Sequence, residues 1–164
     1  KLKDIDPHLW TSPAVMLASA NVLEQTLAGL DPQNAGLYRS NLLRLQERIT
    51  KLDRQLRDIV GGLRTDKLLV YHPAWGHFCL DFGLQQIAIE NEGKAPGAGS
   101  LADLFASLEK GNINFIISSP GADRRLAAIV AKQFRLNLVM INPMDTDWMR
   151  MMLAMKQALE KNEK

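Results

Sequence analysis

The sequence predicts an α/β fold: a three-layer lobe with a four-stranded parallel sheet, preceded by a long helix. From residue 65 onward, short runs rich in Val and Ile alternate with helical stretches, and this alternation is typical of a parallel sheet covered on both faces. Over residues 33–60 an apolar residue recurs every three to five positions, which predicts one helix of about seven turns. The first sixty residues contain helical patterns but no convincing strand.

Two helices are expected in this first part. Ser12 suits the N-cap of the earlier helix, Pro13 suits its first helical position, and Gly29 with the "DP" that follows ends it. The second helix, over residues 33–60, stops at the "GG" of 61–62.

Four strands and three further helices are expected in the second part. The strand candidates are "KLLVYHP" (67–73), "QQIAIE" (85–90), "NFIISSP" (114–120) and "NLVMINP" (137–143). The helix candidates span 100–111, with Ser100 as N-cap and Gly111 at the C-cap, then 122–134 and 147–161.

Composition excludes several classes of protein. The 164 residues have a net charge of +2, and the positive residues lie scattered beside negative ones, so a nucleic-acid-binding stripe is not expected. No run of about 18 apolar residues predicts a transmembrane helix, and no apolar core follows the first lysines as in a signal peptide. The single cysteine, Cys79, cannot form an intrachain disulfide or a cysteine-cluster zinc site.

Polar residues follow the predicted strands, where the carboxyl ends of a parallel sheet collect functional groups. The residues expected along this one edge are His72, Glu90, Ser119, Asn142, Asp145 and Asp147. His72 ends a strand before Pro73, which holds its backbone extended, and imidazole is the commonest metal ligand in proteins. The same position also suits a histidine that only forms a hydrogen bond at a strand end. His77 is expected to pack against neighbouring aromatic residues.

Other chemistries lack their motifs. The "GKAPGAG" segment has neither the Walker spacing nor a G-x-G-x-x-G, and no G-x-S-x-G nucleophile elbow occurs. Cys79 lies between apolar residues, which favours a packing role. The methionine-rich segment 144–155 has a helical repeat, so core packing is favoured over copper binding.

Three segments together resemble one protein family. "DPHLWTSP" (6–13), "VYHPAWGHF" (70–78) and "EGKAPGAGSLADL" (92–104) resemble, in order and spacing, three landmarks of the metal-binding solute-binding proteins of ABC importers, which handle zinc and manganese. The resemblance runs over nearly the whole chain.

The resemblance implies two α/β lobes joined by one rigid helix, with the metal in the cleft between them. Residues 1–30 then correspond to the end of an N-terminal lobe that is otherwise absent from this chain, 31–62 to the linking helix and 65–164 to the C-terminal lobe. It also implies a location outside the cytoplasmic membrane, at most peripheral to it, and an ABC transporter permease as partner.

Carried over by position, the resemblance implies that His8 and His72 are metal ligands. Histidine at the second position favours Zn²⁺ over the alternative, Mn²⁺, because imidazole suits zinc and carboxylate suits manganese. The chain departs from the family where a carboxylate ligand is usual, since Asn142 stands there. Asp145 or Asp147 could replace that carboxylate.

Two further departures concern the same site. Ser119 or its neighbour replaces a usual Glu, and His77, which replaces a usual Tyr, is a further candidate ligand.

The leading interpretation is therefore a binding protein without catalysis. A metal-dependent hydrolase fragment and an adhesin-like interaction protein with a degenerate metal site remain as alternatives. In the isolated chain, His8 and His72 are expected to be too far apart or too mobile to make a closed site.

Overall fold

The computed structural model describes residues 5–90, 97, 99, 104–106, 108 and 112–161. Two short 3₁₀ turns, five α-helices and four strands follow one another within these residues. In chain order they are η1 (Leu9–Thr11), α1 (Pro13–Leu30), η2 (Pro32–Asn34), α2 (Ala35–Gly61), β1 (Lys67–Val70), α3 (Gly76–Phe82), β2 (Gln85–Ala88), β3 (Phe115–Ser118), α5 (Arg124–Phe134), β4 (Asn137–Met140) and α6 (Trp148–Lys161).

The four strands form one parallel sheet in the order β2-β1-β3-β4, which confirms the predicted fold class. Strands β1, β2 and β4 begin where the sequence predicts, and β3 begins one residue later, at Phe115. Each strand ends two or three residues earlier than predicted. The chain leaves β1 toward β2 on one side and reaches β3 on the other, so the strand order reverses at β1. The crevice outside the carboxyl ends of strands at such a reversal is where open α/β sheets bind ligands.

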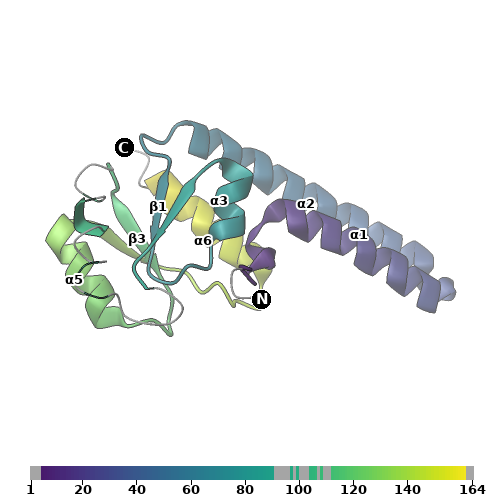
Figure 1. Cartoon of the computed structure of the whole chain (residues 1–164). Helices are drawn as coiled ribbons and strands as arrows, with labels where there is room; N and C mark the ends of the chain where they lie inside the picture. The colour runs from purple at the N-terminus through teal and green to yellow at the C-terminus, as the bar shows by residue number, and fades with distance from the viewer. Residues whose placement is uncertain are drawn as a thin grey trace.

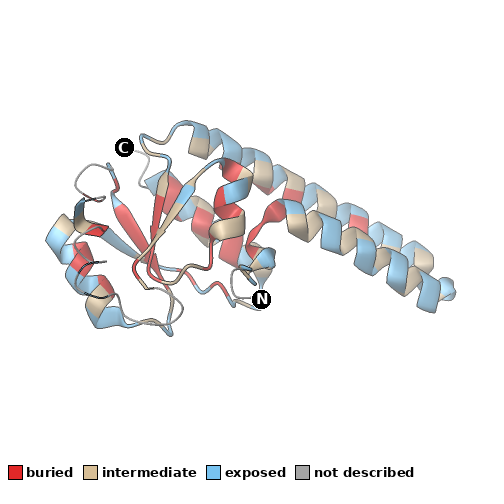
Figure 2. Cartoon of the chain, in the orientation of Figure 1, coloured by how far each residue is buried: buried red, intermediate tan, exposed pale blue. Residues whose placement is uncertain are grey.

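Helices cover both faces of the sheet (Figure 1). Successive side chains of a strand point to opposite faces of the sheet. Leu68 and Val70 therefore pack with residues of α2, α3 and α6, whereas Leu69 and the next residue, Tyr71, pack with residues of α5. Buried residues are concentrated in the strands and on the inner faces of these helices (Figure 2).

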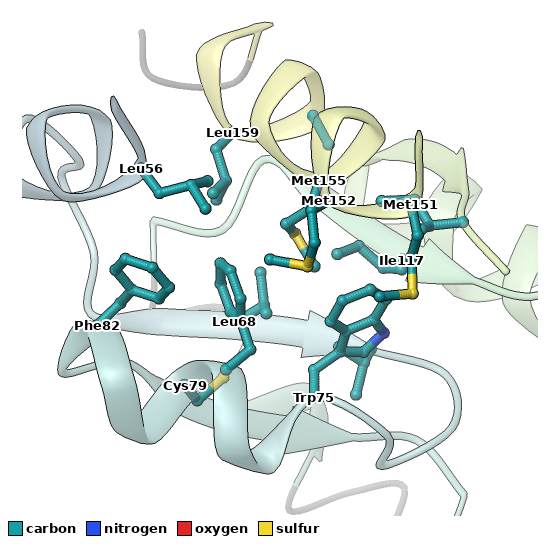
Figure 3. Close-up of a cluster of buried hydrophobic side chains, with 14 of the residues drawn as sticks. Leu56, Leu68, Trp75, Cys79, Phe82, Ile117, Met151, Met152, Met155 and Leu159 are labelled. Carbon is teal, nitrogen blue, oxygen red and sulfur yellow. The ribbon is translucent and has the colours of Figure 1, made fainter. Parts of the chain in front are cut away.

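The larger of the two clusters contains the predicted methionine packing (Figure 3). Met151, Met152 and Met155 of α6 are at most 2% exposed and face Leu68 and Trp75 across the layer. The core role predicted for segment 144–155 is confirmed for these three methionines, whereas Met144 is 66% exposed and Leu153 is 42% exposed.

Helices α1 and α2 lie side by side and project from the lobe (Figure 1). The predicted apolar stripe of α2 is buried at Leu42, Ile49, Leu52 and Leu56, and the last two belong to the core of the lobe. The helix begins at Ala35 rather than residue 33 because a 3₁₀ turn occupies 32–34.

The predicted helix over 100–111 and the resemblance segment 92–104 lie largely outside the described residues. In the part of the chain that the structure describes, no helix is both long and apolar enough to cross a membrane.

Candidate metal centre

The structure brings His8 and His72 together. His72 follows β1 at the carboxyl edge of the sheet, and His8 is the N-cap residue of η1, in the segment that leads into α1. The two Nε2 atoms lie 3.3 Å apart, and the rings meet edge to face with centroids separated by 5.1 Å. The side chain of His8 is 15% exposed and that of His72 is 36% exposed, so the pair faces a partly open surface.

A carboxylate holds each imidazole from behind. Asp6 Oδ1 lies 2.7 Å from His8 Nδ1, and Glu90 Oε1 contacts His72 Nδ1. Glu90 follows β2, the strand paired with β1, which explains why it meets His72. An ionised carboxylate can only accept, so a ring that bonds to it does so through Nδ1–H. In the neutral form of such a ring the other nitrogen, Nε2, carries the lone pair that a metal would bind.

The segment that carries His8 is fastened to the lobe on both sides. Trp10 donates its indole N–H to the carbonyl of Pro143 at 2.7 Å, and Trp148 donates to the carbonyl of Trp10 at 2.6 Å. Ser12 donates to Asp81 Oδ2 at 2.5 Å. These partners are 69 to 138 residues apart in the chain. The first part of the earlier expectation, that the two histidines are too far apart, is therefore wrong. Its other part, that they are too mobile to make a closed site, stays a prediction.

His77 does not turn toward the paired imidazoles. Its Nε2 lies 3.0 Å from the backbone carbonyl of Asp6, and it must donate the proton, since a carbonyl has none. The ring is half-buried and follows Gly76 at the start of α3, a helix that is not among those expected above.

The polar residues after β4 have partners within their own turn. Asn142 Oδ1 accepts from the amide of Met144, and Asp147 Oδ1 accepts from the amide of Arg150 at the start of α6. Asp145 binds the Arg150 guanidinium through Nε at 2.9 Å and Nη2 at 2.5 Å, and this lowers the pKa of the Asp145 carboxyl. A ligand role for Asn142, Asp145 or Asp147 stays a prediction.

The separation of the two imidazoles suits one tetrahedral ion. Two nitrogen ligands at about 2.0–2.1 Å from a tetrahedral zinc lie about 3.3–3.4 Å from each other, and the two Nε2 atoms are separated by 3.3 Å. Among the described residues, no group of three or more His, Cys, Asp and Glu side chains is placed to hold a metal ion. The described chain therefore offers two imidazoles, which is half of a tetrahedral shell.

Two carboxylates that contact the paired imidazoles, Asp6 and Glu90, were not predicted in that role from the sequence. Glu90 was expected at the correct edge of the sheet, and the adjacency of β1 and β2 would have indicated that it contacts His72. Asp6 was not singled out, although a carboxylate two residues before a candidate ligand histidine is a signal for the carboxylate–histidine–metal arrangement.

A parallel four-stranded lobe entered by a long helix, with two converging imidazoles at the edge of its sheet, is the architecture of a solute-binding protein with a helical link. The chain belongs to the family described as zinc-uptake complex component A, periplasmic, whose sequence profile matches residues 2–162.

Individual relatives agree with this assignment. The chain is 25% identical over 142 residues to the zinc-binding protein AdcA of Streptococcus pyogenes serotype M3, a match that covers 85% of this chain and 28% of AdcA. The crystal structure of ZnuA superposes with a TM-score of 0.89 at 28% identity, over 97% of this chain and 62% of that one. A second structure, described as the 138–173 deletion mutant of ZnuA with zinc bound, superposes with a TM-score of 0.86 at 29% identity. This match covers 97% of this chain and 61% of the other.

The chain spans only part of the length of these relatives, from 28% of AdcA to 62% of the ZnuA chain. A relative from Chlamydia muridarum is 25% identical over 156 residues, which cover 94% of this chain and 56% of the relative. A laminin-binding protein of Streptococcus agalactiae, at 19% identity and a TM-score of 0.86, shares the fold.

Proposed function

We propose that this chain is part of an extracytoplasmic solute-binding protein that captures Zn²⁺ and delivers it to the permease of an ABC importer. The observation that carries the proposal is the 3.3 Å separation of the Nε2 atoms of His8 and His72, each of which has its other ring nitrogen held by a carboxylate. Zinc is favoured over manganese because both donors are imidazoles.

The comparisons support this proposal. AdcA is named a zinc-binding protein, and one of the similar ZnuA structures is described as having zinc bound. Because the chain spans only part of its relatives, the cargo, the permease and the location are proposals for the whole protein.

The division of the chain into parts is proposed in the same sense. Residues 65–164 form the C-terminal lobe, 31–62 form the linking helix and 1–30 belong with an N-terminal lobe. Zinc then sits between the segment that carries His8 and the lobe that carries His72. Asn142, Asp145 and Asp147 stay candidates for further ligands.

In this proposal the two carboxylates keep the imidazoles in the tautomer that a metal needs. Each accepts from Nδ1, so that both Nε2 lone pairs are available, and such partners also make the ring more basic as a ligand. Zinc competes with protons for these nitrogens, so its affinity should fall as the pH is lowered.

A binding role fits the described residues better than a hydrolytic one. A metal hydrolase needs a general base beside the metal-bound water. The carboxylates nearest the imidazoles, Asp6 and Glu90, are both engaged with a ring nitrogen. The likeness to the laminin-binding protein shows the fold alone, so adhesion has no support of its own.

The test is a zinc titration against a chromophoric chelator, with the parent chain, His8→Ala, His72→Ala and the double variant. Each single substitution should lower zinc affinity at least 10-fold, and the double variant should retain little specific binding. Manganese should compete poorly. Equal zinc affinity in all four proteins would show that the paired imidazoles are not the metal site.

A further inference from the structure

Asp6 is held at three points by the structure around it. Its Oδ1 accepts from both the backbone N–H and the ring Nδ1 of His8, at 2.9 and 2.7 Å. Its backbone carbonyl accepts from His77 Nε2 at 3.0 Å. Its second carboxylate oxygen, Oδ2, lies against Gly76, where a Cβ atom would come within 2.5 Å of it.

The lack of a side chain at Gly76 therefore makes room for the carboxylate of Asp6. Gly76 does not have a positive φ, so its backbone conformation is open to other residues. The constraint is spatial, because real Cβ atoms essentially never approach another heavy atom as closely as 2.5 Å. The atom that would have to move is Oδ2 at the far end of the Asp6 side chain, whereas the backbone around it could stay in place.

We propose that Gly76 and His77 are positioning residues for His8: by holding Asp6 from the side of α3, they fix the orientation of the His8 ring toward His72. This rests on the proposed function, in which His8 is a zinc ligand. His72, Gly76 and His77 all lie within six consecutive residues. The stretch from the end of β1 to the start of α3 thus carries one ligand and, through Asp6, orients the other.

The first test uses Gly76→Ala, with Gly61→Ala as matched control. No atom lies within 4 Å of a Cβ built at Gly61, so the control adds the same methyl group in open space. Gly76→Ala should lower zinc affinity about 10- to 100-fold, as losses of outer-shell partners typically do. Gly61→Ala should leave zinc affinity unchanged, and both variants should keep the parent's thermal midpoint within a few degrees.

The second test separates the donor of His77 from the bulk of its ring. His77→Phe keeps a ring but removes the N–H, whereas His77→Gln keeps an amide N–H at the same number of bonds from the backbone. The phenylalanine variant should lose about 10-fold in zinc affinity, and the glutamine variant should recover most of that loss. Equal losses in the two variants would show that packing alone is involved. This pair also decides the matter if Gly76→Ala fails to fold.

A third measurement needs no metal. In the zinc-free protein, NMR of the ring nitrogens should show the Nδ1–H of His8 exchanging faster in Gly76→Ala and His77→Phe than in the parent, with His72 unchanged. Parent-like His8 signals and parent-like zinc affinity in both variants would overturn the inference while His8→Ala and His72→Ala still lost zinc. If those two alanine variants bound zinc normally, the proposed function would fail instead, and the NMR result would still report on Asp6.

Discussion

Asp6 and Glu90 each contact the Nδ1 atom of one of the paired imidazoles, yet they come from different parts of the chain. Asp6 is two residues from His8, whereas Glu90 reaches His72 only because β2 pairs with β1. A carboxylate in such a position sets the tautomer and raises the basicity of the ring that it contacts. The charge of each carboxylate, and not only its shape, should therefore matter for zinc.

Glu90→Gln tests that charge. The amide is close in size to the carboxylate, but it is neutral and can present an N–H to the ring, so we expect zinc affinity to fall about 10-fold or more. Calorimetric titration against a competing chelator measures the change. Glu160→Gln is the matched control, because Glu160 is exposed on α6 and pairs with Lys156, away from both histidines, and it should bind zinc like the parent. Parent-like affinity in Glu90→Gln would mean that the contact is not needed for binding.

Cys79 has no part in the metal centre. It is 2% exposed in the core of the lobe, and burial raises the pKa of its thiol to about 12. At pH 8 the folded protein should not react with a thiol reagent such as DTNB, and urea should release one reactive thiol. Fast labelling of the folded protein would contradict the burial.

The raised pKa of the Cys79 thiol also makes the free energy of unfolding depend on pH. Above the ordinary thiol pKa of 9.0 the unfolded chain loses a proton that the folded chain keeps. The contribution of Cys79 to the free energy of unfolding should therefore be full below pH 9 and decline as the pH rises toward about 12.

At the scale of single elements, most helices and strands were predictable because their signals are local. Ser12 and Pro13 mark the start of α1, and the Val- and Ile-rich runs mark the four strands. What local signals could not reveal is how α1 attaches to the lobe. Ser12 Oγ accepts from the amide of Val15 as an N-cap, but it also donates to Asp81, which is 69 residues away and carries no sequence mark of that role.

Ser12→Ala should therefore lower the free energy of unfolding by more than the loss of an ordinary N-cap does. Loss of an N-cap typically destabilises a protein by about 1 kcal/mol, and Ser12 is 1% exposed, so its loss also removes a buried partner of Asp81. We expect a decrease of about 1–2 kcal/mol in the free energy of unfolding, measured by urea denaturation.

Ser40→Ala provides the comparison for this element. Ser40 is exposed in α2 and only donates back to the carbonyl of Leu37, so its replacement should change stability by at most about 0.5 kcal/mol. Equal effects in the two variants would show that the contact with Asp81 adds nothing.

At the scale of the whole molecule, the segment that carries His8 contacts residues from the middle and from near the end of the described chain. Trp10 donates to Pro143, Trp148 donates to Trp10, and His8 faces His72 across the same junction. The resemblance of two short segments singled out His8 and His72 as candidate ligands, and the structure places these two side chains side by side. The resemblance could not predict that they meet within this chain, because the hydrogen bonds that dock the first segment depend on residues more than 130 positions away.

This arrangement leads to a prediction for the 164-residue chain on its own. It should bind Zn²⁺ with micromolar affinity or weaker, because two imidazoles fill half of a tetrahedral shell and water must supply the rest. The preformed 3.3 Å geometry favours binding, but each missing protein ligand removes a charge- or lone-pair donor. Calorimetry should give one ion per chain and an affinity that His72→Ala abolishes. Nanomolar affinity would instead mean that Asp145, Asp147 or another group of this chain closes the shell.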